Sequence, residues 1–513
     1  AWWDLAYIHG KDYVNDPRKA IEYYGEAVKI YKLTNDTTNL ATVYNNMAYQ
    51  YRDLRDSVNT YKHHQLALTL TNVKHRAYEQ GDTHDRWAVT SKYFGNKTQS
   101  LFHYREAARL FKLAGNEHKS AQVLLNVGKG YAAIKNYTKA NETFLESVSV
   151  FKKLGDKGQE AESHWEYAYN QGTNLFKYDE AIGRYRVAYN LYMEAGDSVN
   201  ASVMLSNVGQ NYWSKLDFNK AIESHQAAIA LAKKCRNLTQ VASSWSKLAT
   251  LFTETNNPVA AQQALNNTVD ALHQVNDSTQ LPAAYQDLAS SYIKTKEFNT
   301  AFDYYNKAIG MLKVSKDTLN WALAISNLAS GYQTKTDYKQ AEKLYLDVLA
   351  LQRKIKDKPN LIYTLANLGT LAQAADNNYK KAGTYFDEAV KLSIEIKDDN
   401  ILAFCYLRLK GLNRTQGKFA IAEDYIKKAL DIYTKTNRSK DAAYTLVEMG
   451  NDASYVYGDN VKAVKLLDQA QVISDTLNDV TLKAYLLEVR SNIMSEAGEF
   501  QKALEGRIEV GLG

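Results

Sequence analysis

Small and large apolar residues recur along the chain with a period of 40 or 41 residues. The motif A-x-x-x-[Y/F]-x-x-A returns in thirteen copies, some of them imperfect. A fixed period of this length is typical of a solenoid, in which each unit buries its apolar face only against its neighbours. The spacing therefore predicts one continuous array over residues 1–513 rather than separate globular domains. The marker residue that opens each copy is Ala20, Thr60, Ser100, Ala140, Ala181, Ala221, Ala261, Ala301, Ala341, Ala382, Ala422, Ala463 or Ala503.

Within a unit, small and large residues alternate at helical spacing. With the marker alanine counted as position 20, positions 8 and 27 are small in most copies and positions 11 and 24 are large. The unit of Ala301 illustrates this with Ala289, Tyr292, Tyr305 and Ala308 at positions 8, 11, 24 and 27. Spacings of three, four and seven residues between apolar positions indicate helices. The small residues are expected to let two helices approach closely, with the large ones filling the space beside them.

Two polar breaks in each unit mark where the helices end. One lies inside the unit, as at Lys135-Asn136-Tyr137, and the other leads to the next unit, as at Gly155-Asp156. Asn, Asp and Gly suit such turns because they tolerate left-handed backbone angles. All four prolines stand where a helix would start, a place that tolerates the missing N–H. Each unit is therefore predicted to be helix, turn, helix, turn, with about 26 helices in total and no β-sheet. The prolines are Pro17, Pro258, Pro282 and Pro359.

The small and large residues at positions 8, 20, 24 and 27 resemble the signature of the tetratricopeptide repeat family. The resemblance covers essentially the whole chain. It implies an all-α fold, a right-handed superhelical solenoid of about 13 helix-turn-helix repeats. The family's usual repeat is 34 residues, so the extra residues here are expected to lengthen the helices. This longer form resembles repeats of cargo- and peptide-binding adaptors, and of the sensory regions of some bacterial regulators and sensor kinases.

The resemblance also implies where a partner would bind. In this family the first helix of each unit lines a concave groove, and its positions 2, 5, 6, 9, 12 and 13 usually contact the ligand. The predicted groove residues include five asparagines at position 6 and four further polar or aromatic side chains. They are Asn46, Tyr49, Asn126, Lys129, Asn207, Gln210, Lys247, Asn327 and Asn367.

Asparagine is a mediocre helix residue, so its return at position 6 needs a physical reason. One interpretation is a ladder of amides, each offering a donor and an acceptor to the backbone of a bound peptide. The other is that each asparagine hydrogen-bonds the neighbouring repeat and stabilises stacking. The two interpretations are about equally supported by the sequence, and both can hold at once.

Residues 50–112 differ from the rest of the chain. Two marker alanines are replaced there, by Thr60 and Ser100, and the stretch holds eleven lysines and arginines against six aspartates and glutamates. Five of the ten histidines lie there as well: His63, His64, His75, His84 and His103. A solvated basic surface is the favoured interpretation. A patch for an acidic partner or an anionic surface is one alternative. A metal site formed by imidazoles on adjacent helices is another.

Composition excludes several other functions. The net charge of +6 over 513 residues is small, and no dominant charge marks the groove, so nucleic acid is not expected as a partner. Cys235 and Cys405 lie four repeats apart, which predicts two free thiols. No apolar run is long enough to span a membrane. No phosphate-binding loop, catalytic triad motif, zinc motif or EF-hand loop is present, so no catalysis, cofactor or metal is expected.

The sequence therefore predicts a non-enzymatic scaffold that binds a protein or peptide segment along its concave face. One alternative is a sensory or regulatory input region of a larger bacterial sensor kinase or transcription regulator. Another is a structural subunit that forms homo-oligomers through uncapped terminal repeats. The absence of a polar cap after the last repeat suggests that natural sequence continues beyond Gly513. The compartment stays open between the cytoplasm and the bacterial periplasm.

Overall fold

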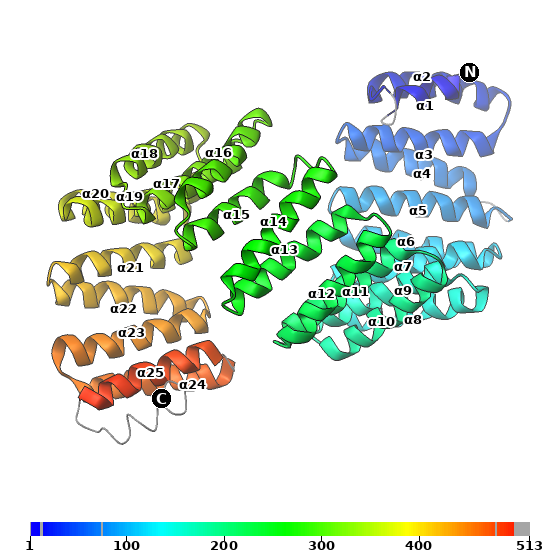
Figure 1. Cartoon of the computed structure of the whole chain (residues 1–513). Helices are drawn as coiled ribbons and strands as arrows, with labels where there is room; N and C mark the ends of the chain where they lie inside the picture. Colours follow the sequence, from blue (N-terminus) through cyan, green and yellow to red (C-terminus); the bar gives the residue numbers. More distant parts are fainter. Residues whose placement is uncertain (1, 11–13, 73–74, 478–479, 497–513) are drawn as a thin grey trace. The chain divides into compact units, whose positions relative to one another are not determined.

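A computed structural model describes residues 2–10, 14–72, 75–477 and 480–496 of the chain. It groups them into two compact units, residues 1–277 (unit 1) and 278–513 (unit 2). Within the described residues every regular element is helical, with 25 α-helices and one π-helical turn (Figure 1). The predicted helix-turn-helix repeat fold is confirmed. The last marker, Ala503, lies outside the described residues, and the single continuous array over residues 1–513 stays a prediction.

Unit 1 contains seven helix pairs and the π-helical turn η1. Its elements are α1 (Trp2–His9), α2 (Pro17–Leu33), α3 (Thr37–Asp53), α4 (Ser57–Thr71), α5 (Ala77–Tyr93), α6 (Lys97–Leu113), α7 (Glu117–Ala133), α8 (Tyr137–Leu154), α9 (Lys157–Tyr169), η1 (Asn170–Asn174), α10 (Tyr178–Glu194), α11 (Ser198–Ser214), α12 (Phe218–Lys234), α13 (Leu238–Glu254) and α14 (Pro258–Gln274).

Unit 2 continues the same alternation. Its helices are α15 (Leu281–Lys294), α16 (Phe298–Val314), α17 (Thr318–Thr334), α18 (Tyr338–Ile355), α19 (Lys358–Asp376), α20 (Tyr379–Ile396), α21 (Asp399–Thr415), α22 (Phe419–Lys435), α23 (Ser439–Tyr457), α24 (Asn460–Leu477) and α25 (Val480–Glu496). In both units the odd-numbered helices are the first helices of the repeats, and the even-numbered ones carry the marker residues.

The turns return every 20 or 21 residues, twice per repeat. Nearly every turn contains one residue with a left-handed backbone, such as Lys135, Gly155 or Lys296, with φ of 62°, 72° and 65°. Most are followed by an Asp or Asn whose side chain accepts the N–H three residues on, as Asp156 does from Gln159 at 3.0 Å. This N-cap supplies one of the partners that a helix start lacks. Two helices of about 17 residues and two short turns therefore produce the 40-residue period.

Three units are one residue longer, and each extra residue lies late in a first helix. In the unit of Ala181 it forms the π-helical turn Asn170–Asn174. In the units of Ala382 and Ala463 it lengthens α19 and α23 to 19 residues. Each insertion follows the small residue of position 8, which is Ala168, Gly369 or Gly450. Positions 1 to 8 of these helices therefore keep the register of the other repeats.

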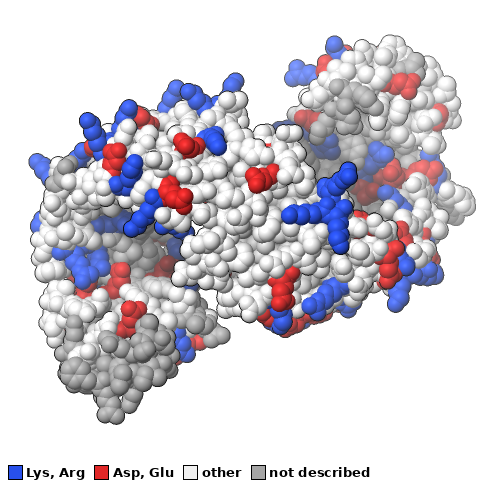
Figure 2. Space-filling model, viewed as in Figure 1, with Lys and Arg blue, Asp and Glu red and all other residues white. Residues whose placement is uncertain are grey.

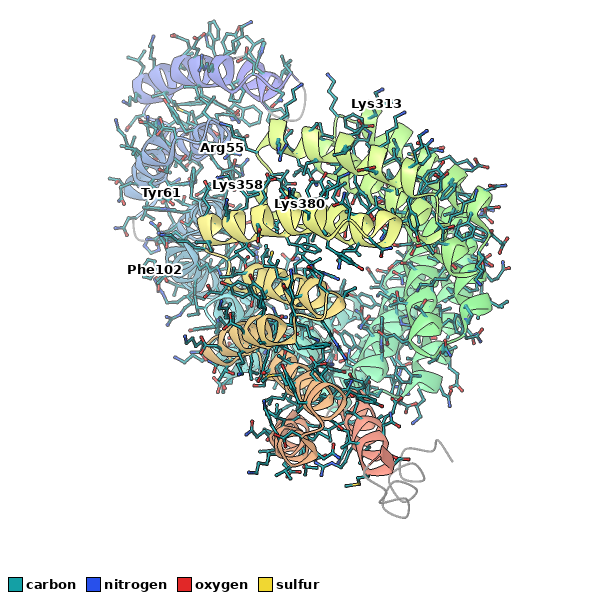
Figure 3. All side chains as sticks on the ribbon, turned by 90° about the vertical axis from the view of Figure 1, so that its left-hand side faces the viewer. Arg55, Tyr61, Phe102, Lys313, Lys358 and Lys380 are labelled. Atoms are coloured by element: carbon teal, nitrogen blue, oxygen red, sulfur yellow. The ribbon has the colours of Figure 1, made fainter. Side chains whose placement is uncertain are left out.

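Within each repeat, the small residue at position 8 packs against the large residue at position 24. A Cβ added to Gly128 would lie 2.4 Å from the ring of Phe144, and one added to Gly369 would lie 2.5 Å from Phe386. The marker alanines at position 20, Ala301 for example, are fully buried in most repeats. Side chains fill the spaces between neighbouring helices in each unit (Figure 3). The predicted pattern of small and large positions is thus the contact surface between the paired helices.

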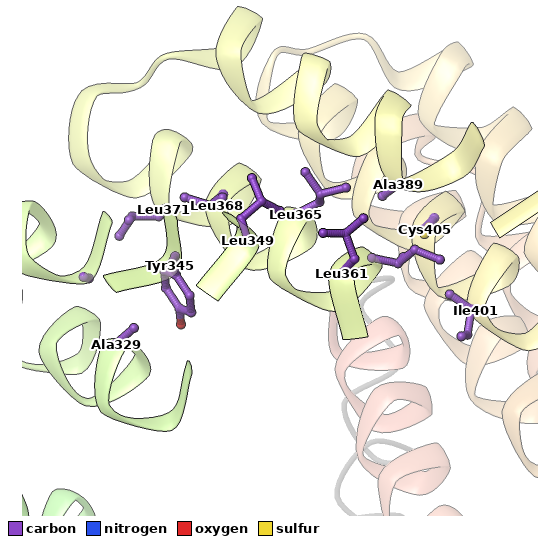
Figure 4. Close-up of a cluster of buried hydrophobic side chains, with 12 residues drawn as sticks. Ala329, Tyr345, Leu349, Leu361, Leu365, Leu368, Leu371, Ala389, Ile401 and Cys405 are labelled. Carbon is purple, nitrogen blue, oxygen red and sulfur yellow. The ribbon is translucent and has the colours of Figure 1, made fainter. Parts of the chain in front are cut away.

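The hydrophobic core runs along each unit as a chain of clusters rather than as one centre. In unit 2 one cluster joins Tyr345 and Leu349 of α18 to Leu365 of α19 and Cys405 of α21 (Figure 4). Apolar contacts therefore pass from repeat to repeat, as expected for a solenoid. Cys405 is buried, Cys235 is partly exposed, and both are free thiols, which confirms that prediction.

The first helices also contact one another directly. Helix α3 contacts α5, α7 contacts α9, and α11 contacts α13 in unit 1, and unit 2 has the same contacts between α15 and α17 and between α19 and α21. In each unit the first helices form a layer of their own. Side chains at the same position of successive first helices therefore lie in rows.

The interpretation of residues 50–112 as a solvated basic surface is wrong for four of the five histidines. His63, His64, His84 and His103 are buried between helices, and only His75 lies in an exposed turn. The Nδ1 atoms of His84 and His103 are 2.8 Å apart, and His64 lies between Asn45 and Thr90. Several arginines of this stretch also pair with acids; the Asp53 carboxylate, for example, accepts from Arg52 at 2.7 Å. The polar residues that replace small and aromatic ones here form a core network.

Candidate functional site

The side chains at position 6 of the first helices form one row in each unit, called here the position-6 row. On α3 to α13 and on α15 to α23 each of them is half-buried or exposed, and the residue that follows it is buried. Ala6 of α1 and Val489 of α25 occupy the same position and are buried. In unit 1 the row comprises Asn46, Arg86, Asn126, Glu166, Asn207 and Lys247. In unit 2 it comprises Asp287, Asn327, Asn367, Arg408 and Glu448.

The five predicted asparagines are all half-buried, but they differ in their partners. Asn46 Oδ1 accepts a hydrogen bond from Arg86 of the next repeat at 3.3 Å, and Asn327 Nδ2 donates to Gln286 Oε1 of the preceding repeat at 3.0 Å. These two bonds link neighbouring repeats. Within the described part of the chain, the side chains of the remaining three asparagines have no hydrogen-bond partner. Those three are Asn126, Asn207 and Asn367.

The other predicted groove residues lie on the same layer of first helices. Tyr49 is half-buried, with the guanidinium of Arg52 at 4.8 Å from its ring centre and that of Arg86 at 5.8 Å. Lys129 pairs with Glu166 of the next repeat, Nζ to Oε1 at 2.9 Å. Gln210 is half-buried on α11. Lys247 donates to Ser206 Oγ at 3.1 Å.

Three hollows follow the position-6 rows. The first, of about 440 Å³, is lined by Asn46 and Arg86 together with Tyr24, Tyr49 and Gln50. The buried Oε1 atom of Gln50 has no hydrogen-bond partner there. Two further hollows lie in unit 2, one of about 250 Å³ and one of about 370 Å³, and Ser330 lines both. The rows thus border recessed surface in both units.

The unit 2 hollows adjoin along the first helices. The one of about 250 Å³ is lined by Gln286, Asp287, Ser290, Ile293, Tyr305, Asn327, Ser330 and Gly331. The one of about 370 Å³ is lined by Ser330, Gln333, Thr334, Tyr338, Tyr345, Asn367, Thr370, Ala374 and Arg408. Because they share Ser330, they form one recessed path, called here the unit 2 groove. It runs from α15 to α21 and is lined mainly by hydroxyl and amide groups.

Sequence reasoning missed the charged members of the row. It looked for a repeated asparagine and therefore passed over Arg86, Glu166, Asp287, Arg408 and Glu448, which occupy the same position. The register that places the asparagines would have found them, once the late insertions in α9 and α23 are allowed for. Glu166 and Glu448 fall at position 6 only when the inserted residue is placed after position 8, which is Ala168 in α9 and Gly450 in α23.

The charges of the row fall into two groups. Three are paired with an opposite charge: Arg86 with Asp82 at 2.7 Å, Glu166 with Lys129 and Glu448 with Lys410 at 3.1 Å. Lys247, Asp287 and Arg408 have no oppositely charged partner among the described residues.

Two of the unpaired charges, Lys247 and Asp287, are held in partly dehydrated surroundings, and the third lies over an aromatic ring. Burial lowers the pKa of Lys247, and the walls of the hollow raise the pKa of the Asp287 carboxyl although its side chain reaches solvent. Arg408 stacks over Phe404, with 4.7 Å between its guanidinium carbon and the ring centre. A ligand of opposite charge would stabilise the charged form of each of these side chains.

On the face shown, positive and negative side chains are interspersed in both units (Figure 2). Among the described residues, no three His, Cys, Asp or Glu side chains come together as metal ligands would. The same residues contain no helix that combines the length and the apolar character needed to span a membrane.

Three family models match parts of the chain. Two are tetratricopeptide repeat models, which match residues 321–382 and 282–311. The third describes the soluble NSF attachment protein, SNAP, and matches residues 78–257. No curated protein matches the chain.

Several solved structures are similar to the chain at low sequence identity. A signal transduction ATPase with numerous domains and a tetratricopeptide repeat sensor, from Pyrococcus horikoshii, is 13% identical with a TM-score of 0.50; the match covers 84% of this chain and 67% of that one. Aspartyl phosphate phosphatase F from Bacillus subtilis is 15% identical over 68% of this chain and 92% of its own, with a TM-score of 0.39. These likenesses concern the fold alone. The two repeat models, together with the helix-turn-helix architecture, show that the chain contains tetratricopeptide repeats.

Proposed function

We propose that this protein is a non-enzymatic scaffold that binds an extended peptide or protein segment along its first helices. The observation that carries the proposal is the course of the position-6 rows. They border three hollows, and they present three half-buried asparagine amides that have no hydrogen-bond partner among the described residues. A recessed path of amides and hydroxyls is suited to a peptide backbone, which needs donors and acceptors in alternation.

The amides can serve both stacking and binding. Asn327 donates to Gln286 and keeps its Oδ1 atom for a second bond. Asn126, Asn207 and Asn367 keep both donor and acceptor. A half-buried amide is already partly dehydrated, so a hydrogen bond to a ligand replaces fewer bonds to water. A lost bond of this kind that leaves its partner unsatisfied costs about 1–3 kcal/mol.

Selection from a display library of random 12-residue peptides on the full chain would test the proposal. We expect enriched peptides whose affinity falls by a factor of five or more when Asn207 or Asn367 is replaced by Ala. The matched control is Asn306→Ala on α16, a second helix, and it should leave affinity unchanged. Peptides that bind equally well to the asparagine variants and to the control would contradict the proposal.

A second candidate function is a regulatory input region. It is supported by the fold-level likeness to a protein whose repeats are described as a sensor. In that case a bound peptide should change the shape of the protein. Small-angle X-ray scattering with and without a selected peptide separates the two: an unchanged distance distribution indicates a passive scaffold, and a shift indicates an input region.

A further inference from the structure

We propose that the unit 2 groove is charge-polarised, and that it selects an extended peptide with a basic side chain over Asp287 and a carboxylate over Arg408. This inference rests on the proposed function and specifies its ligand. The juxtaposition that carries it is the order of side chains along the row. A lone acid, two amides and a lone guanidinium follow one another on α15, α17, α19 and α21.

At the α15 end, the hollow offers acceptors without a cation. The Asp287 carboxylate has no lysine, arginine or histidine partner among the described residues. Asn327 directs its Nδ2 to Gln286, and Gln286 Nε2 in turn donates to the carbonyl of Pro282 at 3.3 Å. This chain of donation leaves Asn327 Oδ1 as a further acceptor beside Asp287. A carboxylate and an amide oxygen in one recess suit an ammonium or guanidinium group.

At the α21 end, the groove offers a cation without an acid. Arg408 is exposed, and its guanidinium is supported from below by the ring of Phe404 at 4.7 Å. A planar guanidinium held in this way presents its N–H groups in a fork that matches a carboxylate. Asn367 and Thr370 line the same hollow and can donate to or accept from the flanking backbone.

Neighbouring charges do not cancel this polarity. Glu448, the next member of the row after Arg408, is paired with Lys410 at 3.1 Å. Asn327 and Asn367, which lie between the two charged ends, are neutral. Three repeats at about 10 Å per packed helix place Asp287 and Arg408 roughly 30 Å apart. An extended chain rises about 3.3 Å per residue, so about nine residues would join the two charges.

The test uses display libraries in which two fixed residues flank eight randomised uncharged residues, with an amidated C-terminus. The fixed pairs are Lys with Glu in either order, Lys with Lys, Glu with Glu, and Gln with Gln. We expect the Lys and Glu libraries to be enriched on the full chain at least tenfold over the others. The best peptides are then measured by fluorescence polarisation against Asp287→Asn and Arg408→Gln.

Double-mutant cycles assign each end of the peptide. Replacing the peptide's Lys by Gln should weaken binding about tenfold to the native protein but leave binding to Asp287→Asn unchanged. Replacing its Glu by Gln should behave in the same way with Arg408→Gln. A free-acid peptide that lacks the Glu shows whether a C-terminal carboxylate serves equally well over Arg408. Asp347→Asn and Lys343→Gln on α18 make the same charge changes on a second helix and should have no effect.

Two results would overturn the inference. One is a double-mutant cycle that shows an interaction energy between the peptide's Lys and Arg408, or between its Glu and Asp287. The other is strong binding from the Gln library that responds to Asn367→Ala but not to Asp287→Asn or Arg408→Gln. This second result rejects the polarity and keeps the proposed function. If no library yields a peptide sensitive to Asn367→Ala, the proposed function fails as well.

Discussion

Units 1 and 2 repeat the same helix pair but place polar groups differently. All ten histidines of the chain precede residue 278, and six of them are buried: His63, His64, His84, His103, His164 and His225. Unit 2 contains no histidine, and its buried residues are apolar apart from a few hydroxyl, thiol and amide groups and Lys410. The groove charges differ as well. In unit 1 two of the three charges of the row are paired, whereas in unit 2 two of the three have no oppositely charged partner within the described ranges.

The comparison shows that a repeat constrains the shape of a position more than its chemistry. Position 24 holds Phe144 or Phe386 in some repeats and His64 or His225 in others, and all four are fully or almost fully buried. A histidine ring fills that space, but it titrates, and it needs partners such as Asn45 and Thr90 around His64. The two units are therefore expected to respond differently to the same perturbation.

Acidification should produce the largest difference between the units. Burial lowers the pKa of His64, His103 and His225 to about 3 and that of His164 to about 4. In the unfolded chain these groups titrate near 6.5, so stability is full above that pH and falls as the pH drops toward the folded values. At pH 5 each contributes roughly 2 kcal/mol of destabilisation.

Unit 2 provides the internal control for acidification. The pKa of its Glu423 carboxyl is lowered to about 2 by hydrogen bonds from Lys462 and Lys427, so that stabilisation is lost only as the pH falls from 4.5 toward 2. Hydrogen exchange read by mass spectrometry at pH 7 and pH 5, corrected for intrinsic rates, follows each unit separately. We expect faster exchange in residues 57–277 and little change in unit 2. Equal protection in both units at pH 5 would contradict the prediction.

Overpacking of the marker position should affect one unit at a time. Ala221 and Ala301 are both fully buried between helices. Replacement of either by Leu is expected to cost about 1–3 kcal/mol of unfolding free energy. Hydrogen exchange should increase in unit 1 for Ala221→Leu and in unit 2 for Ala301→Leu. If both variants melt like the native protein, the assignment of position 20 to the helix contact is wrong.

Adding a methyl group at position 8 should cost somewhat less. A Cβ at Gly128 or Gly369 would overlap the facing Phe ring at 2.4 or 2.5 Å. Relief of the clash costs about 1–3 kcal/mol, and the better helix propensity of Ala returns up to about 1 kcal/mol. Gly411→Ala on α21, where a Cβ would meet nothing within 4 Å, is the matched control and should stabilise slightly. An increase in the melting temperature of all three variants would show that the Phe rings move aside freely.

The smallest expected change in stability should distinguish an asparagine that bonds a neighbouring repeat from one that makes no such bond. Asn327→Ala breaks the bond to Gln286 and is expected to cost about 0.5–1.5 kcal/mol. Asn367→Ala removes an amide without a protein partner and should leave stability unchanged or raise it slightly, because Ala favours the helix. Differential scanning calorimetry on both variants is the measurement. Equal losses would mean that Asn367 also stabilises stacking.

The fold could be predicted from the sequence because the same pattern of small and large residues recurs in repeat after repeat. Ala221 alone is uninformative, but a small residue recurring every 40 or 41 positions, opposite a large residue, defines a helix contact. The buried histidines could not be predicted in this way. His63 and His103 share position 23, yet basic residues surround both in the sequence. Only the packing of α4, α5 and α6 shows that these rings face the core and the arginines pair with nearby acids.

The candidate site was predicted in part. The register placed the five asparagines on the first helices, where they are half-buried. It did not distinguish Asn327, which bonds Gln286, from Asn367, which bonds no described residue, because that depends on the neighbouring side chain. The charged members of the row were missed because Asp287 and Arg408 look like ordinary surface charges in sequence. Their importance comes from the lack of an oppositely charged partner in the described part of the chain, which only the three-dimensional structure reveals.

The late insertions in α9, α19 and α23 bear on how such a protein could be re-engineered. One added residue turns everything beyond it by about 100° around the helix axis. Because all three insertions follow position 8, the row at position 6 keeps its direction and only the end of the helix rotates. The first three turns of each first helix, which carry the row, thus keep a fixed register, and only the last part of the helix varies in length. Side chains of the row can therefore be exchanged, and the C-terminal part of a first helix lengthened, as independent design choices.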